Sequence, residues 1–386
     1  MEFTHNGNKI EFSVNGEPFY IKSLYADSGA DIKEYGLEFL SSPYFEAELD
    51  YQEVFISGIS STLGWIVPLA LLEEMDQTVI DSLPSYAKMF ADIAIKKLLV
   101  NYLVNKGLDE LDSDECILSK MYSSDIALFI YRKSIVPSNS ISTFIPSLYD
   151  AGYYSNDNPY DKSEGWYKSK LMNDIANDVR TENRHKVTLK ELKSLHYGME
   201  YIRNLYKTIL PVSQDVFQRF IVLYQVMEIL MEEEFEIDVF KVNVEYAKGA
   251  ITKNTLRQKL IESTSEDTKI TRALDGVHED SYMIEFKSEV SDLLDKIKKD
   301  YSDCTVYAHY LYKIRNTVVH SLREIVKYNY SLQRIIELLE KNIFNILCTH
   351  TIKEDAKDML FYADNSVSKK TNVKRFRIFL NEKGIH

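Results

Sequence analysis

The second half of the chain has the apolar periodicity of consecutive α-helices. From Tyr167 onward, apolar side chains recur every three or four residues, which predicts amphipathic helices rather than strands. The predicted helices cover residues 167–182, 188–209, 213–236, 239–262, 282–299, 302–325 and 331–349. Pro211 separates two of them, Thr188 to Glu191 match a capping box, and residues 262–280 are expected to form a loop. This region is therefore predicted to fold as a helical bundle.

The first 25 residues have the pattern of a small β-meander instead. Asn6-Gly7 and Asn15-Gly16 are dipeptides that favour tight hairpin turns, and short alternating segments flank them. Strands are predicted over residues 9–14, 19–24 and 51–59, and helices over 69–75, 86–104 and 116–131. We therefore expect a mainly α protein, in which a smaller α+β N-terminal domain with a short β-meander precedes the helical bundle.

Residues 137–166 are the expected domain boundary. They are rich in Ser, Asn, Gly and Pro and are long for an ordinary loop, so they are predicted to be a linker. The linker would join an acidic α+β domain of residues 1–136 to a helical domain of residues 167–350. Residues 351–386 would form a basic C-terminal tail.

The formal net charge of −13 is unevenly distributed along the chain. Residues 1–130 contain 8 Lys, no Arg and 22 Asp or Glu, a net charge of −14, which leaves +1 for residues 131–386. A protein that coats nucleic acid without regard to sequence relies on an excess of clustered cations. The charge excludes that class of protein, but it does not exclude a local phosphate-binding site in the near-neutral region.

The cysteines and the apolar segments indicate a cytoplasmic protein. Cys116, Cys304 and Cys348 are far apart and have no CxxC pair or His at metal-ligand spacing, so neither a disulfide scaffold nor a structural zinc is expected. The first residues lack the pattern of a secretory signal, and the longest apolar run, residues 63–72, is too short to cross a bilayer. Glycine-rich phosphate loops are missing, so no cofactor is expected either. Together these patterns predict no cofactor, no metal and no membrane partner.

The segment HYLYKIRNTVVHSL, residues 309–322, combines an apolar stripe with a polar face. On a helix with about 100° per residue, one stripe collects Leu311, Ile314, Val318, Leu322 and Ile325. His320 then lies about 160° from the centre of that stripe, Asn316 lies one turn before it, and Arg315 lies at the border between the two faces. The helix is predicted to bury one side and to present these three polar side chains on the other.

Such side chains suit chemistry at a phosphodiester. A guanidinium binds phosphate through a charged fork of donors. An imidazole titrates near neutral pH and can both accept and release a proton. Together they can support the attack of a ribose 2′-hydroxyl on the adjacent phosphate.

The motif Arg315-Asn316-x-x-x-His320 resembles the signature of the HEPN superfamily, all-helical proteins of toxin, antiviral and CRISPR-associated systems. The order of helices is similar as well, with residues 217–230 before the motif helix and residues 331–350 after it. Active members of this family cut RNA without a metal, at a composite site between two paired bundles. The resemblance therefore implies a metal-independent endoribonuclease of a prokaryotic defence or toxin system. It also implies a homodimer and an RNA substrate, with tRNA as one candidate.

The resemblance also assigns roles to individual residues. The implied catalytic residues are Arg315, Asn316, His320 and Glu228, and the implied substrate-binding residues are Lys313, Thr317 and His309. His320 would transfer the proton at the 2′-hydroxyl or the leaving 5′-oxygen, and Arg315 would hold the phosphate. Asn316 would fix the orientation of the ligand or the imidazole, and Glu228 would orient Arg315.

Alternatives remain open for these residues and for the acidic domain. The helical domain could bind RNA, a nucleotide or a protein partner without cutting, or Arg315 could lie on a solvated face and pair with Glu324 or Asp303. Two further Arg–His pairs, Arg180/His185 and Arg272/His278, have a similar spacing but lack an apolar stripe or contain an Asp-Gly turn. The acidic domain could bind an antitoxin or a phage-derived trigger, or inhibit the ribonuclease.

Overall fold

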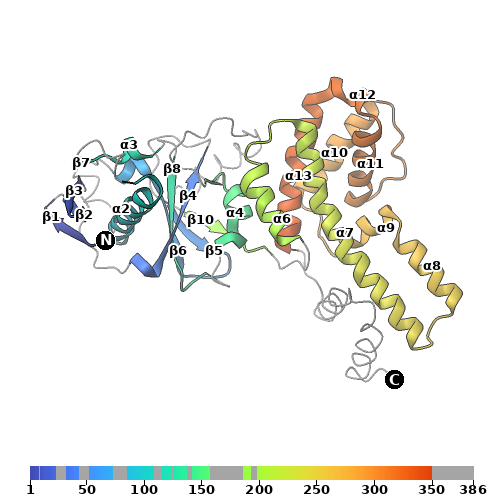
Figure 1. Ribbon diagram of the computed structural model, residues 1–386. Coiled ribbons are helices and arrows are strands. Elements are labelled where there is room, and N and C mark those ends of the chain that lie inside the picture. Colours follow the sequence, from blue (N-terminus) through green and yellow to red (C-terminus); the bar gives the residue numbers. More distant parts are fainter. Residues whose placement is uncertain are drawn as a thin grey trace. The chain divides into compact units, whose positions relative to one another are not determined.

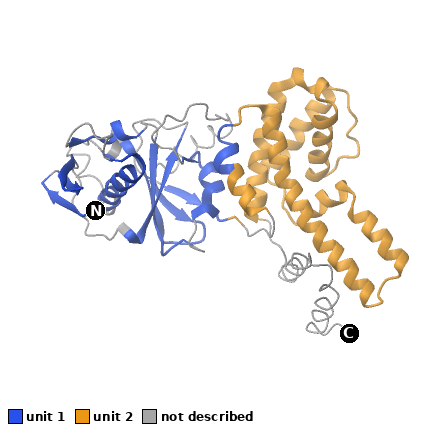
Figure 2. Ribbon diagram, viewed as in Figure 1, with its two compact units in different colours: residues 1–191, 206–212 blue, residues 192–205, 213–386 orange. Residues whose placement is uncertain are grey.

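The chain folds into two compact units in a computed structural model (Figures 1 and 2). Unit 1 comprises residues 1–191 and 206–212, and unit 2 comprises residues 192–205 and 213–386. The structure describes residues 1–7, 9–22, 32–42, 52–72, 85–107, 115–122, 126–136, 141–156, 186–192 and 198–349. The predicted helix over 167–182 and the predicted tail over 351–386 lie outside the described residues.

The N-terminal meander is confirmed. Strands β1 (Phe3–Asn6), β2 (Lys9–Val14) and β3 (Glu17–Lys22) form consecutive antiparallel pairs, and β7 (Glu115–Cys116) adds to β3 in parallel. Asn15 and Gly16 adopt φ values of 53° and 90° at the tip of the second hairpin. Both central turn positions therefore have the positive φ for which the Asn-Gly dipeptide is suited.

A larger sheet of six strands forms the centre of unit 1. Its strand order is β10-β5-β6-β8-β4-β9, and of the pairs in it only β10–β5 is parallel among the described residues. The strands are β4 (Tyr35–Ser41), β5 (Gln52–Ile56), β6 (Thr62–Pro68), β8 (Ile126–Arg132), β9 (Tyr154–Ser155) and β10 (Lys186–Leu189).

An apolar cluster packs on each face of this sheet, and helices contribute side chains to both clusters. One cluster packs strand residues such as Trp65 and Ile130 against Phe90 and Leu98 of α2 (Ser85–Lys106). The other cluster, around Phe129, includes side chains from η4 (Ile141–Phe144) and α4 (Ile145–Asp150). Short helices η1 (Ile32–Glu34), η2 (Leu69–Leu72) and α3 (Leu118–Met121) complete the described part of unit 1.

Three sequence predictions in this region are wrong. The helix expected over 116–131 is replaced by β7, α3 and β8. The apolar run of β8 is buried on both faces of the sheet, so its sequence has no periodicity that distinguishes a strand from a helix. Thr188 lies in β10 rather than at a helix start, so the capping box is absent. Residues 141–156 of the expected linker fold into unit 1, where β9 pairs with β4.

The described residues of unit 2 form helices joined by loops, and residues 206–212 between α6 and α7 belong to unit 1. The helices of unit 2 are α6 (Met199–Asn204), α7 (Val216–Ala247), α8 (Lys253–Ser263), α9 (Glu266–Ala273), α10 (Ser281–Lys296), α11 (Tyr307–His320), α12 (Leu322–Ile325), the 3-10 turn η6 (Val326–Tyr328) and α13 (Asn329–Thr349). A π-helical turn, η5 (Leu205–Ile209), follows α6. The predicted helical bundle is thus confirmed. The prediction of a mainly α protein is only partly correct, because unit 1 contains a six-stranded sheet in addition to the meander.

Five helices of unit 2 pack as a closed ring. α7 contacts α13, α13 contacts α10, α10 contacts α11, α11 contacts α9, and α9 returns to α7. Two predicted helices, 213–236 and 239–262, are replaced by the single helix α7 followed by α8, and α9 lies in the stretch that was expected to be a loop. Among the residues that the structure describes, no helix has the length and apolar character needed to cross a membrane.

Candidate functional site

Helix α11 carries the Arg-Asn-x-x-x-His motif and buries the side opposite to it. Leu311, Ile314 and Val318 are buried at 0%, 0% and 4% exposure, which confirms the predicted apolar stripe. Leu322 departs from that stripe and is 43% exposed, because α11 ends at His320 and Ser321 leaves helical geometry with φ −130° and ψ 31°. His320 therefore lies at the exposed C-terminal end of the helix.

Hydrogen bonds to the Glu279 and His309 side chains define where α11 begins. A carboxylate oxygen of Glu279 accepts a hydrogen bond from the backbone N–H of Tyr307 at 2.9 Å, and Lys287 pairs with the same carboxylate. The Nδ1 atom of His309 accepts from the backbone N–H of Thr305 at 3.2 Å. Because an amide can only donate, this bond leaves the proton of a neutral His309 ring on Nε2.

We expect the stability provided by the Glu279 cap to depend on pH. Partial burial opposes the charged carboxylate, but hydrogen bonds from Lys287 and the Tyr307 N–H outweigh it and lower the pKa of Glu279 below its ordinary value of 4.5. A lowered folded-state pKa stabilises the protein above pH 4.5, and that contribution is lost as the pH falls through the folded-state value. Chemical unfolding of wild type and Glu279→Gln should therefore differ at pH 7 and converge at low pH; an equal difference at both pH values would contradict this cap.

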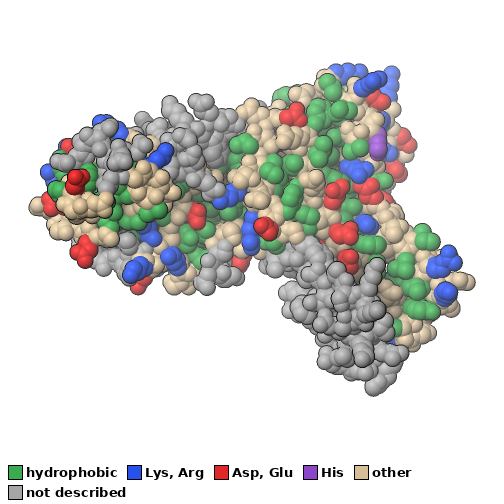
Figure 3. Space-filling model, viewed as in Figure 1, with side chains coloured by type: hydrophobic (Ala, Val, Ile, Leu, Met, Phe, Trp, Pro, Cys, Tyr) green, Lys and Arg blue, Asp and Glu red, His purple; other side chains and the backbone are tan. Residues whose placement is uncertain are grey.

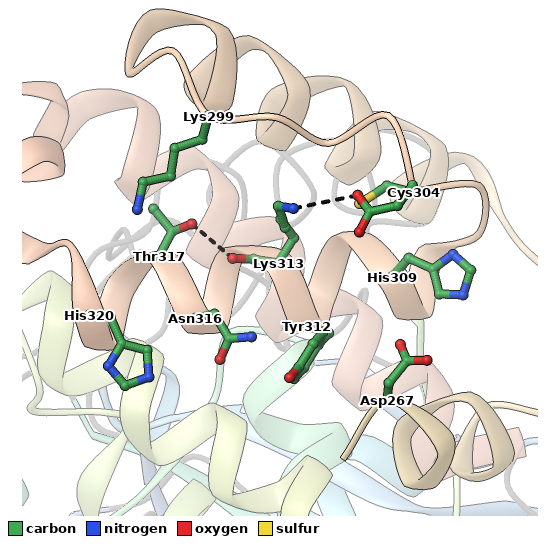
Figure 4. Close-up of a pocket in the computed structure, with 10 residues that line it drawn as sticks. Asp267, Lys299, Cys304, His309, Tyr312, Lys313, Asn316, Thr317 and His320 are labelled. Atoms are coloured by element: carbon green, nitrogen blue, oxygen red, sulfur yellow. Dashed lines mark hydrogen bonds and ion pairs between the residues drawn. The ribbon is translucent and has the colours of Figure 1, made fainter. Parts of the chain in front are cut away.

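A pocket of about 510 Å³ follows the polar face of α11 (Figure 4). It is lined by Asp267, Lys299, Asp303, Cys304, His309, Tyr312, Lys313, Asn316, Thr317 and His320. Tyr312, Asn316 and His320 follow one edge of the helix, and Lys313 and Thr317 follow the adjacent edge. The structure thus brings five of the seven predicted site residues into one pocket: Asn316, His320, Lys313, Thr317 and His309.

Arg315 borders this pocket without lining it. Its Nη1 atom donates to Oδ1 of Asn316 at 3.0 Å, and its Nε atom lies 3.3 Å from a carboxylate oxygen of Glu266. The guanidinium also lies over the ring of Tyr224, 5.6 Å from its centroid. The hydrogen bond to Asn316 joins Arg315 to the pocket, and Glu266 and Tyr224 hold it from the opposite side.

Glu228, the predicted partner of Arg315, forms no ion pair with it among the described residues. Glu228 is exposed on α7, and the carboxylate that pairs with Arg315 belongs to Glu266 at the start of α9. The hydroxyl of Tyr224 donates to Glu266 at 3.2 Å, and burial together with this carboxylate raises the pKa of Tyr224, so the hydroxyl remains protonated. Neither Glu324 nor Asp303, the partners considered for a solvated face, forms an ion pair with Arg315 among the described residues; they pair with Lys299 and Lys313.

Charges of both signs line the pocket. Lys313 lies 3.4 Å from Asp303, and Lys299 contacts Ser321 and lies 3.7 Å from Glu324. The hydroxyl of Thr317, a predicted substrate contact, donates to the backbone carbonyl of Lys313 at 2.9 Å, so its proton is already used within the helix. This balance of charges suits a short anionic segment better than an extended polyanion.

Cys304 does not supply a nucleophile at neutral pH. Burial, together with the neighbouring Asp303 carboxylate, raises the pKa of its thiol to about 11. A cysteine reacts through its thiolate, which is a minor form at pH 7 when the pKa is this high. The candidate acid–base groups of the pocket are therefore its histidines.

Sequence reasoning missed Glu266 and Lys299 as parts of the site. Tyr312, a tyrosine of the motif helix that could stack on bases, also lines the pocket. Glu266 and Lys299 come from α9 and from the loop after α10, and no local pattern connects them with the motif. The competing pair Arg272/His278 has a structural explanation, because Arg272 forms an ion pair with Asp238 of α7. Arg180/His185 lies outside the described residues.

Comparisons with known proteins add no relative to this picture. No family model matches the chain, and neither the curated proteins nor the solved structures contain a significant match. Within the described part of the chain, no group of three or more His, Cys, Asp or Glu side chains could hold a metal ion. The function is therefore inferred from the site itself and from the motif.

Proposed function

We propose that this protein is a HEPN-type endoribonuclease of a prokaryotic defence or toxin system and acts in the cytoplasm. The observation that carries the proposal is the pocket along α11, in which His320 lies one turn from Asn316 and Asn316 is hydrogen-bonded to Arg315. An imidazole can transfer a proton and a guanidinium can bind phosphate, so the proximity of His320 and Arg315 through Asn316 supports the proposal. The motif resemblance supplies the reaction class.

The reaction proceeds by internal attack within the RNA. His320 accepts the proton of a ribose 2′-hydroxyl or donates a proton to the leaving 5′-oxygen, while the 2′-oxygen forms a bond to phosphorus and the bond to the 5′-oxygen breaks. Arg315 stabilises the additional negative charge on the phosphate oxygens in the transition state. The products are a 2′,3′-cyclic phosphate and a 5′-hydroxyl, and no further reactant is required.

An assay on natural RNA tests the proposal directly. Purified protein is incubated with total RNA and with tRNA in the presence of EDTA, and the ends of any fragments are analysed. We expect cleavage at selected sites with 2′,3′-cyclic phosphate ends, because the proposed chemistry uses only protein groups. Intact RNA under all conditions, with the RNA bound to the protein, would instead favour a non-catalytic module.

That non-catalytic alternative has an observation in its favour. Glu266 already pairs with Arg315, and Asp267 and Asp303 line the same pocket. On the face shown in Figure 3, Lys and Arg are interspersed with Asp and Glu over the described residues and do not form a continuous basic surface. Such a site can bind one phosphate group or one RNA end without turning it over, since broad RNA binding requires an excess of cations.

The assignment of Glu266 gives a paired prediction. Replacing Glu266 with Gln should lower RNA cleavage by about tenfold, because the guanidinium of Arg315 loses the carboxylate that orients it beside Asn316. Replacing Glu228 with Gln should leave the rate within about twofold, since Glu228 is exposed and makes no ion pair with Arg315 among the described residues. Single-turnover rates of both variants measure this; the reverse ranking would restore Glu228 as the orienting residue.

We propose that the protein acts as a homodimer whose interface adjoins His320. Exposed apolar side chains follow the motif at intervals of three or four residues: Val319 (51% exposed), Leu322 (43%), Val326 (52%) and Tyr330 (80%). Exposed apolar side chains next to the motif favour burial against a second protein surface. A two-fold interface here would place two copies of the motif next to each other.

A single charge tests this interface. Val326→Asp should convert the dimer to a monomer in analytical ultracentrifugation, because an unpaired carboxylate is costly to bury in an apolar interface. Ile284→Asp is the matched control, since Ile284 is 57% exposed on α10 and should leave the dimer intact. A wild-type protein that is monomeric at all concentrations would contradict the proposal.

The N-terminal α+β unit is proposed to regulate the ribonuclease. Its charge of −14 over residues 1–130 suits a basic partner, such as an antitoxin or a phage-derived trigger. An acidic surface could also compete with RNA for the basic groups of the site.

A further inference from the structure

A pocket of about 510 Å³ in unit 1 takes no part in the ribonuclease proposal. It is formed by η1, β4, the end of β8 and one face of α2. Its lining residues are Lys33, Tyr35, Gly36, Leu37, Phe39, Lys97, Val100, Asn101, Val104, Tyr131 and Lys133. All belong to the same compact unit.

Three lysines meet at one end of this pocket. The Nζ atom of Lys97 donates to the backbone carbonyl of Tyr35 at 2.5 Å, and the Nζ atom of Lys133 donates to the backbone carbonyl of Lys33 at 3.1 Å. Tyr35 is the first residue of β4 and Lys33 lies two residues before it. These hydrogen bonds place the ammonium groups of Lys97 and Lys133 at the beginning of one strand, where Lys33 also lines the pocket.

The opposite end of the pocket is apolar. Leu37 and Phe39 lie two and four residues after Tyr35 on the same face of β4, so they continue the pocket away from the lysines. Phe39 stacks on Tyr122 with ring centroids 5.6 Å apart. The lining thus changes from cationic to apolar along the strand.

Helix α2 shows the same change in the same direction. Val100, Asn101 and Val104 follow Lys97 at intervals of three, four and seven residues, which places them on one helical face. Tyr122, the stacking partner of Phe39, also packs on Tyr102, with ring centroids 5.9 Å apart, so the apolar end of the strand faces the C-terminal end of α2. Asn101 lies between the cationic and apolar ends.

The charge of this pocket is the opposite of that of the surrounding chain. Among residues 1–130, 22 of the 30 charged side chains are acidic, yet the described residues that line the pocket include three lysines and no Asp or Glu. Glu38 alternates with Leu37 and Phe39 along β4 and lines a different pocket on the other face. A cavity whose described lining carries three lysines is an attractive site for a compact anion.

We propose that this pocket binds a nucleoside phosphate as a ligand. The phosphate groups are bound by Lys33, Lys97 and Lys133, and the base packs against Leu37, Phe39 and Val104. The amide of Asn101 hydrogen-bonds the edge of the base. The volume lies within the range of about 300–1,000 Å³ that is typical of small-molecule sites. The ligand is bound and no bond is broken, so the inference does not depend on the ribonuclease.

Isothermal titration calorimetry of the full chain tests the proposal. The probes are the four ribonucleoside triphosphates, their nucleosides and inorganic pyrophosphate, all with EDTA. We expect at least one triphosphate to bind about tenfold more tightly than either its nucleoside or pyrophosphate, because each of these lacks one half of the complementary ligand. Pyrophosphate binding as tightly as every triphosphate, or no binding of any probe at millimolar concentration, would overturn the proposal.

Matched variants locate the ligand. Lys133→Met and Lys97→Met should each weaken triphosphate binding by about tenfold, and Lys133 is exposed, so its replacement leaves the core intact. Lys120→Met is the control, because Lys120 is exposed on α3 and does not line the pocket. His320→Ala should retain full binding. Loss of binding in His320→Ala, or equal loss in Lys120→Met, would place the ligand elsewhere and contradict the assignment; thermal unfolding of each variant confirms that it is folded.

Discussion

Replacing His320 with Ala is expected to reduce the rate of RNA cleavage by about 100-fold or more, the contribution that a positioned general acid or base makes. Arg315→Ala should reduce it by a similar factor, because the transition state loses its cationic partner. Both side chains are partly or largely accessible on α11, so their truncation leaves the core of the bundle intact. The measurement is the single-turnover rate on an RNA that the wild type cleaves.

Controls for this experiment come from the competing residues of the same types. His278 is exposed in the loop after α9, and Arg257 is exposed on α8, so His278→Ala and Arg257→Ala should cleave like the wild type. If His320→Ala and Arg315→Ala also cleave like the wild type, the ribonuclease proposal fails. If they lose cleavage but retain RNA binding, His320 acts in the chemical step rather than in binding.

Replacing Arg219 with Met is expected to destabilise unit 2 by about 3–5 kcal/mol, the cost of leaving one member of a buried ion pair without its partner. Arg219 of α7 and Glu340 of α13 are 1% and 3% exposed and form an ion pair inside the bundle. Arg219 also donates to the backbone carbonyl of Ser213 at 2.9 Å. Its removal therefore leaves a buried carboxylate and a buried carbonyl that each lose a charged donor.

A double variant separates loss of the pair from loss of packing. Arg219→Met with Glu340→Leu should recover most of the lost stability, because replacing both members with apolar groups removes the uncompensated charge. Lys259→Met is the surface comparison, since the Lys259–Glu245 pair is 40% and 44% exposed and should contribute at most about 1 kcal/mol. Chemical denaturation measures all three; equal losses in the single and double variants would show that packing rather than charge dominates.

The apolar periodicity of the sequence predicts most of the helices correctly but does not predict the six-stranded sheet. Helices α10 and α13 begin and end near their predicted bounds, because one buried face and one solvated face produce a clear pattern of three or four residues. Helix α11 is present but is shorter than the predicted helix over 302–325 at both ends. Residues 126–130 of β8 are buried on both faces of the sheet, so their sequence lacks the alternation that distinguishes a strand from a helix. The parallel pairing of β10 with β5 joins segments about 130 residues apart, which no local pattern encodes.

The candidate site was predictable as far as it lies on one helix. Asn316, His320, Lys313, Thr317 and His309 come together because helical geometry aligns residues three, four and seven apart. Glu266 pairs with Arg315 only because α9 packs against α11, and the same packing leaves Glu228 on the exposed side of α7. Tertiary packing therefore decides which of these two carboxylates pairs with Arg315.

The amino-acid sequence by itself determined the N-terminal meander, the helical character of the second half and the face of α11 that carries the motif. Each depends on dihedral preferences or periodicity within a few turns of chain. Only the tertiary structure decided the acidic partner of Arg315, the closure of the pocket by Lys299 and Asp267, and the gathering of three lysines in an acidic unit. These features depend on contacts between distant segments, whose positions follow from packing the whole core rather than from any local pattern.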